Sequence, residues 1–110
     1  MKFNLENRLI EYLALIVEIA YSMPKDYFST YLSNQLVRSG LSSALYSAEA
    51  QRAESRIGLV HKTTIALKEL QETHMNQRVI ERTRLVSDRE KRGSIFVKSI
   101  ETTKRNMSNV

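Results

Sequence analysis

The stretch from Leu9 to Met23 constrains the fold of this chain most, because twelve of its fifteen residues are apolar. Its polar residues are Glu11, Glu18 and Ser22. At about 100° per residue, these three side chains lie within roughly 40° of one another on a helix. One layer of a small bundle needs apolar residues at only about three or four positions in seven. The apolar residues in excess of that requirement predict a helix buried on nearly every side, partly against another copy of the chain.

Composition favours one all-helical domain spanning residues 1–110. Three glycines and one proline are too few for the tight turns of an all-β fold. The absence of cysteine excludes disulfides and thiolate metal sites and permits a reducing compartment. We recognise no secretory signal, and the apolar run is too short and too acidic to cross a membrane. The expected location is the cytoplasm, with no membrane partner.

Four helices are predicted, at about residues 4–23, 27–52, 56–84 and 88–105. Pro24 ends the first, because proline disfavours helix in the residue before it. Asp26 and Ser55 are the expected N-caps of the second and third, and a capping box from Ser87 to Glu90 opens the fourth. Short connections between them predict an antiparallel up-down four-helix bundle.

Gly40 is the doubtful point of the second helix, because glycine costs about 1 kcal/mol relative to alanine inside a helix. Two interpretations stay open. The helix kinks or breaks there, or the small side chain lets a neighbouring helix approach closely.

The periodicity of apolar residues predicts which side chains face the core. In the second helix these are Phe28, Tyr31, Leu32, Gln35, Leu36, Ser39, Ser43, Tyr46 and Ala50. In the third they are Ile57, Leu59, Val60, Thr63, Thr64, Ala66, Leu67, Leu70 and Met75, after which the phase slips and leaves Val79 and Ile80 off the stripe. In the fourth they are Phe96, Ile100, Thr103 and Met107, with residues 106–110 expected to fray.

Charge is distributed unevenly along a chain whose formal net charge is +5. Residues 1–77 carry eight basic and eight acidic side chains, whereas residues 78–105 carry nine and four. An imbalance confined to the last third favours an anionic partner. Lys91, Lys98 and Arg105 recur every seven residues, which places them on one line facing solvent.

Cations on rigid helices neutralise phosphates and release counterions, which gives salt-sensitive, sequence-independent binding. The predicted phosphate contacts are Arg78, Arg82, Arg84, Lys91, Lys98 and Arg105. The alternatives are a solvated surface that keeps an oligomer soluble and a surface for an acidic protein partner. The basic face lacks aromatic residues, which argues against stacking on single-stranded bases.

The over-apolar first helix predicts a subunit interface. Ile65, an isolated apolar residue on the polar side of the third helix, indicates a second contact. The predicted interface residues are Leu9, Leu13, Ile16, Val17, Ala20 and Ile65.

Neither a metal site nor catalysis is predicted, and no cofactor is expected. His61 and His74 lie about 220° apart around one helix, so they cannot bind one ion. His74 is expected to be a hydrogen-bonded core residue, and His61 an exposed or interface one. No nucleophile with an adjacent base and no phosphate-binding glycine loop is present. The carboxylates of Glu49, Glu54, Glu69 and Glu72 are expected to pair with Arg38, Arg52, Lys62 or Lys68.

The middle of the chain reads QLVRSG at 35–40, AEAQRAES at 48–55 and HKTTIALKELQET at 61–73. In order and spacing these segments resemble the four helix bundle protein family, first noticed in intervening sequences of bacterial 23S ribosomal RNA genes. The resemblance covers most of residues 3–105. More distantly, the chain is similar to the accessory variability proteins of diversity-generating retroelements, which are basic pentameric bundles.

The resemblance implies a homo-oligomer, with a pentamer favoured, and binding to RNA or DNA. It also implies a reverse transcriptase or another acidic protein as a possible partner. The expected function is therefore that of a non-enzymatic, accessory nucleic-acid-binding protein that acts through a basic C-terminal surface. The alternative is a protein-interaction scaffold with no nucleic-acid affinity.

Overall fold

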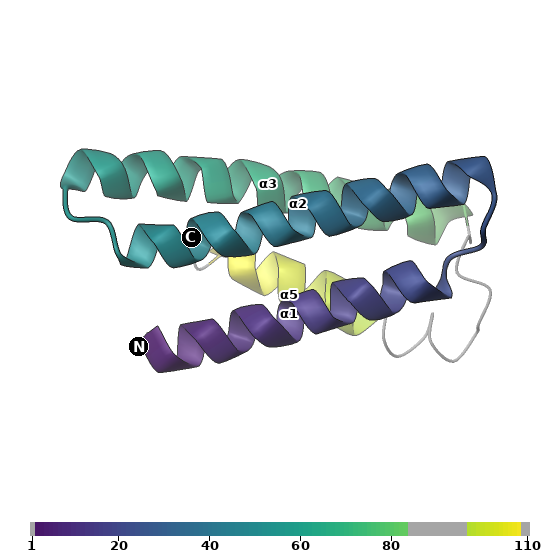
Figure 1. Ribbon diagram of the computed structural model, residues 1–110, viewed down its shortest axis with the longest axis horizontal. Helices are drawn as coiled ribbons and strands as arrows, with labels where there is room; N and C mark the ends of the chain where they lie inside the picture. The colour runs from purple at the N-terminus through teal and green to yellow at the C-terminus, as the bar shows by residue number, and fades with distance from the viewer. Residues whose placement is uncertain (1, 84–96, 109–110) are drawn as a thin grey trace.

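The computed structural model describes residues 2–83 and 97–108, which form four helices in an up-down bundle (Figure 1). The helices are α1 (Lys2–Ser22), α2 (Tyr27–Gln51), α3 (Arg56–Thr83) and α5 (Val97–Ser108). Helix α2 packs between α1 and α3, and α5 closes the bundle against α3 and α1. The predicted all-α four-helix bundle is confirmed. No helix in the described part of the chain is both long and apolar enough to cross a membrane.

The predicted helix boundaries in the first three helices are correct to within two residues. Asp26 caps α2, because its carboxylate accepts hydrogen bonds from the Ser29 backbone N–H at 3.0 Å and the Ser29 hydroxyl at 2.9 Å. The Ser55 hydroxyl accepts from the Gly58 N–H at 3.0 Å at the start of α3. The capping box at 87–90 and Phe96 lie outside the described residues.

The expected fraying after residue 105 is wrong for residues 106–108, because α5 continues through Ser108. Asn106 is buried, and its side-chain oxygen accepts a hydrogen bond from the Arg8 guanidinium at 3.3 Å. This contact joins the last turn of α5 to α1 and holds the chain in the helix.

The core is formed mainly by Tyr12, Ile16 and Ile19 of α1 and by Met23 directly after it, which recur every three or four positions. Leu36, Leu70 and Ile80 complete the buried cluster, and Ile100 and Met107 pack against it from α5. Helix α2 runs through Gly40 without a break. A Cβ atom built on Gly40 would lie 3.4 Å from both Ile16 Cγ1 and Cγ2, so of the two interpretations the close helix approach is correct.

Several predicted core positions are wrong. Phe28 and Tyr31 are 72% and 55% exposed, and Ile57, Leu59, Val60, Thr64 and Met75 are also exposed. The buried face of α3 keeps the predicted Ala66 and Leu70 and continues through Thr73, Gln77 and Ile80, at alternating spacings of four and three. Two of these core residues are polar, so a stripe chosen by apolarity alone ends too early. Ile80 is in phase, and the apparent slip after Met75 is absent.

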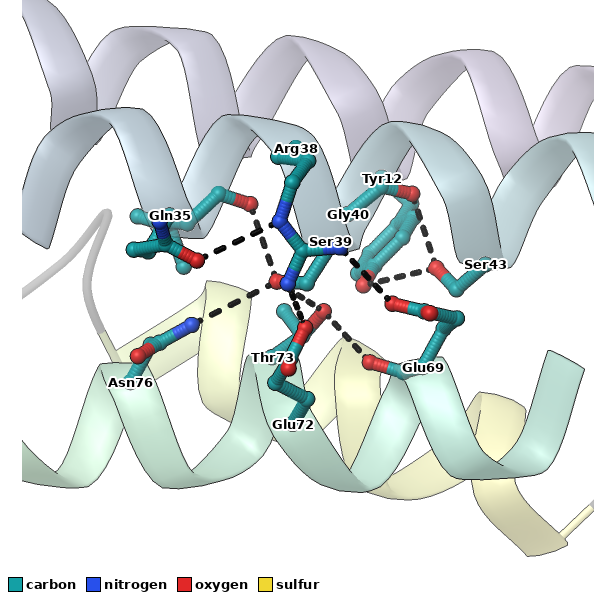
Figure 2. Close-up of polar contacts among 11 residues, drawn as sticks. Tyr12, Gln35, Arg38, Ser39, Gly40, Ser43, Glu69, Glu72, Thr73 and Asn76 are labelled. Atoms are coloured by element: carbon teal, nitrogen blue, oxygen red, sulfur yellow. Dashed lines mark hydrogen bonds and ion pairs between the residues drawn. The ribbon is translucent and has the colours of Figure 1, made fainter. Parts of the chain in front are cut away.

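A buried polar layer crosses the middle of the bundle (Figure 2). The Thr73 hydroxyl of α3 donates to Ser39 Oγ of α2 at 2.8 Å, and the Ser43 hydroxyl lies 3.3 Å from the Tyr12 hydroxyl of α1. Farther along α3, Gln77 Nε2 donates to Ser99 Oγ of α5 at 2.6 Å. Hydrogen bonds at these positions fix the register of all four helices, because a shifted helix would bury unpaired polar groups.

Candidate nucleic-acid interface

Two cations in the middle of the bundle, Arg38 of α2 and Lys62 of α3, are paired with carboxylates. The Arg38 guanidinium contacts Glu72 and, at 3.4 Å, Glu69. The hydrogen bond to Glu72, together with the nearby carboxylate charges, raises the pKa of Arg38. Lys62 pairs with Glu49 at 3.0 Å. These are three of the expected pairings, and they leave little net charge on this side of the bundle.

The cations near the end of α3 and on α5 are arranged differently. We call them the α3/α5 basic surface, comprising Arg78, Arg82, Lys98, Lys104 and Arg105. All five are exposed, and none forms an ion pair with another residue that the structure describes. Arg84 and Lys91, also predicted as phosphate contacts, lie outside the described residues. The structure thus places four of the six predicted cations on exposed helical positions.

Helix α5 divides this surface into two parts. Lys98 and Arg105 border a hollow whose α1 side carries Glu11 and Glu18, so carboxylates reduce the positive potential there. Arg78 and Arg82 border a hollow at the end of α3 in which Glu81 is the acidic residue. Because Arg8 also lines the hollow on the α1 side, each of the two hollows has one more cation than carboxylates.

The charges of two of these cations act on the imidazole of His74. Partial burial lowers its pKa from 6.5, and the positive charges of Lys104 on α5 and Arg78 on α3 lower it further, against the opposing charge of Glu81. Its Nδ1 is buried and has no hydrogen-bond partner among the described residues. The prediction of a hydrogen-bonded core residue is therefore wrong, because His74 is only partly buried and its Nδ1 is unpaired among the described residues. His61 is exposed.

Lys104 was absent from the predicted site. It does not share the seven-residue spacing of Lys98 and Arg105, and it faces α3 whereas they face α1. Its contribution depends on how α5 is rotated against α3. Adjacency to Arg105 in the sequence was the only available signal, and it does not specify that rotation.

His74 makes stability dependent on pH in a defined direction. Because the folded protein favours the neutral imidazole, stability is fully present above the ordinary pKa of 6.5 and falls as the pH drops through the lowered pKa. We expect the thermal midpoint of wild type to fall between pH 7.5 and pH 5.0, and His74→Gln to reduce that fall.

The control for this measurement is His61→Gln, which removes an exposed histidine from the same helix. It should show the same difference in thermal midpoint between the two pH values as wild type. Equal pH dependence in His74→Gln and wild type would show that the His74 imidazole is not responsible.

The predicted subunit interface needs correction. Ile16 is 0% exposed and Leu9 is also buried, so both belong to the core of the protomer and offer no surface to a partner. Leu13, Ala20 and Ile65 are half-buried, and Val17 is 41% exposed. The burial on nearly every side that was expected from a partner is supplied in part by α2 and α5.

A different apolar surface remains on α1 and α2. Ile10, Val17 and Tyr21 are exposed and recur at intervals of seven and four, so they share one face of α1. Leu41 and Leu45 are exposed one turn apart on α2, in line with Val37, which packs against the core cluster. We call these five exposed residues the α1/α2 apolar surface. Contiguous exposed apolar residues are typical of protein–protein contacts.

Comparison with known proteins gives an informative match among solved structures. No protein-family model matches the sequence, and no curated protein matches it either. A solved structure is similar over 96% of this chain and 96% of its own, with 30% identity and a TM-score of 0.74. That structure is of a protein with unknown function from the S23 ribosomal protein family of Bacteroides thetaiotaomicron.

Proposed function

The chain belongs to the S23 ribosomal protein family, and we propose that it is a non-enzymatic protein that binds nucleic acid through its α3/α5 basic surface. The observation that carries the proposal is the gathering of exposed cations on the end of α3 and on α5, without ion-pair partners among the described residues. Arg38 and Lys62 have carboxylate partners, whereas Arg78, Arg82 and Lys104 have none among the described residues. The family name, which refers to the ribosome, favours RNA over DNA.

The spacing of the cations suits a double-stranded backbone better than single-stranded bases. Arg78 and Arg82 lie one turn apart on α3, and Lys104 lies across the seam on α5. Such contacts neutralise phosphates without reading bases. Three contacts from one protomer give weak binding, and a homo-oligomer multiplies them.

The proposal therefore includes self-association, with a pentamer as the expected size. The α1/α2 apolar surface supports it, because five large apolar side chains are exposed there on two neighbouring helices. An acidic protein, such as a reverse transcriptase, is the alternative ligand for the basic surface.

The test is fluorescence anisotropy of labelled duplex RNA and duplex DNA between about 50 and 200 mM salt. We expect binding that weakens steeply with salt. The variant Arg78→Glu/Arg82→Glu/Lys104→Glu should weaken it by at least about 100-fold and reduce the salt slope by about three, because each lost phosphate contact removes about one.

A charge-matched control separates this surface from net charge alone. Lys25→Glu/Arg52→Glu/Lys68→Glu changes the charge equally at three exposed positions outside the α3/α5 basic surface. It should leave the salt slope unchanged. An equal loss in both variants would contradict the assigned surface, and no binding by an oligomeric wild type at low salt would favour the scaffold function.

A further inference from the structure

A third hollow, of about 460 Å³, lies at the end of the bundle where α1 and α3 begin and α2 and α5 end. Its apolar walls include Leu5 and Leu9 of α1 and Leu59 and Val60 of α3. Helix α5 ends at Ser108, and Asn106 in its last turn closes one side of the hollow. The volume falls in the range of small-molecule sites. None of the four predicted phosphate contacts that the structure describes lines it.

Two polar residues that line this hollow, Arg8 and Asn106, contact each other. Asn106 is 7% exposed, and its Nδ2 is buried without a hydrogen-bond acceptor among the described residues. Its Oδ1 accepts from the Arg8 guanidinium at 3.3 Å. That contact fixes the amide, because the flipped orientation would place two donors against each other. Arg8 forms no ion pair within residues 5–83 and 97–108.

We propose that this hollow binds a small carboxylate with an aliphatic tail. The carboxylate oxygens would accept hydrogen bonds from the Arg8 guanidinium, which Asn106 Oδ1 holds at 3.3 Å, and the tail would lie against Leu9, Leu59 and Val60. One guanidinium balances a single negative charge, whereas a phosphate dianion would leave a charge unpaired beside apolar walls. Two helices begin and two end around the hollow, so their dipoles largely cancel and Arg8 sets the sign of the charge.

The probe is decanoate, added to the full-length protein and followed by calorimetry and by methyl NMR. We expect one decanoate per chain, with shifts concentrated at the methyl groups of Leu9, Leu59 and Val60. Decan-1-ol keeps the tail without the charge and should bind about 10- to 100-fold more weakly, the range expected for losing a charged hydrogen bond. Acetate, which lacks the tail, should give no detectable binding.

Two variants test the assigned residues. Arg8→Gln should weaken the binding of decanoate by about 10- to 100-fold. The matched variant Arg52→Gln removes an exposed arginine outside the hollow and should leave that affinity unchanged. Ser47→Phe places a ring at the wall of the hollow and should also abolish binding. Far-ultraviolet circular dichroism establishes that each variant is folded, and Ser47→Phe keeps the test decisive if Arg8→Gln does not fold.

Three results would overturn the proposal. Calorimetry could detect no heat of decanoate binding to wild type, or Arg8→Gln could bind decanoate as tightly as wild type. Decanoate could also bind only as an oligomer dissociates, in which case a second copy of the chain occupies the hollow. None of these results bears on the α3/α5 basic surface, so the nucleic-acid proposal stands or fails separately.

Discussion

Ile16→Asp is expected to unfold the protein at neutral pH. Ile16 is 0% exposed and sits at the centre of the core cluster, against Gly40 of α2. The substitution removes a buried apolar side chain and introduces a carboxylate with no cation within the cluster. We expect it to lower the free energy of unfolding by at least about 4 kcal/mol. Urea denaturation followed by circular dichroism measures that loss, which is a large share of the about 5–15 kcal/mol typical of a domain.

The matched control is Val17→Asp, one residue along the same helix. Val17 is 41% exposed, so its carboxylate would stay hydrated and the fold should be retained. If the α1/α2 apolar surface joins subunits, Val17→Asp should convert the oligomer to monomers, as measured by light scattering. A folded Ile16→Asp protein would contradict the core assignment, and a fully assembled Val17→Asp protein would contradict the interface.

These neighbouring positions show why the sequence predicted the first helix correctly and its partners incorrectly. The apolar run is long enough to specify a helix, and Pro24 and Asp26 specify where it ends and the next begins. The run has apolar residues on both its inner and outer faces, so apolarity cannot tell which face the protomer itself covers. That information comes from the packing of α2 and α5, which depends on residues far away in the sequence.

The third helix shows the opposite limitation. Its core face includes Thr73 and Gln77, which hydrogen-bond to Ser39 and Ser99 on other helices. A polar residue is favourable in a core only when its partner is present. Because that partner lies on another helix, the pattern of a single helix gives no signal of it. The apolar pattern therefore selected Met75, which is exposed, and passed over Thr73 and Gln77.

The candidate site was only partly predicted from the sequence, because it too depends on how separate helices pack against one another. Unbalanced charge identifies the cations, and helical periodicity identifies those that face solvent. Four predicted cations are indeed exposed on α3 and α5. Periodicity does not show that Glu11 and Glu18 face Lys98 and Arg105 across a helix seam, or that Lys104 approaches His74. These relations depend on the rotation of α5.

Gly40→Leu is expected to destabilise the bundle through the α1/α2 contact. Even a Cβ atom at this position would be 3.4 Å from two atoms of Ile16, so the rest of a leucine side chain has no free space. Overpacking of this kind costs up to about 3 kcal/mol, which the better helix propensity of leucine offsets by about 1 kcal/mol. We expect a net loss of about 2 kcal/mol in the free energy of unfolding.

Gly40→Ala is the control, because its Cβ reaches only ordinary contact distance and the helix propensity of alanine should keep stability or raise it by up to about 1 kcal/mol. The decisive variant is Ile16→Ala/Gly40→Leu. If the two side chains compete for one space, the double variant should be more stable than the sum of the single losses predicts, by about 0.5–3 kcal/mol. Strict additivity would mean that leucine at position 40 is accommodated elsewhere, and that the glycine is not what lets α1 approach α2.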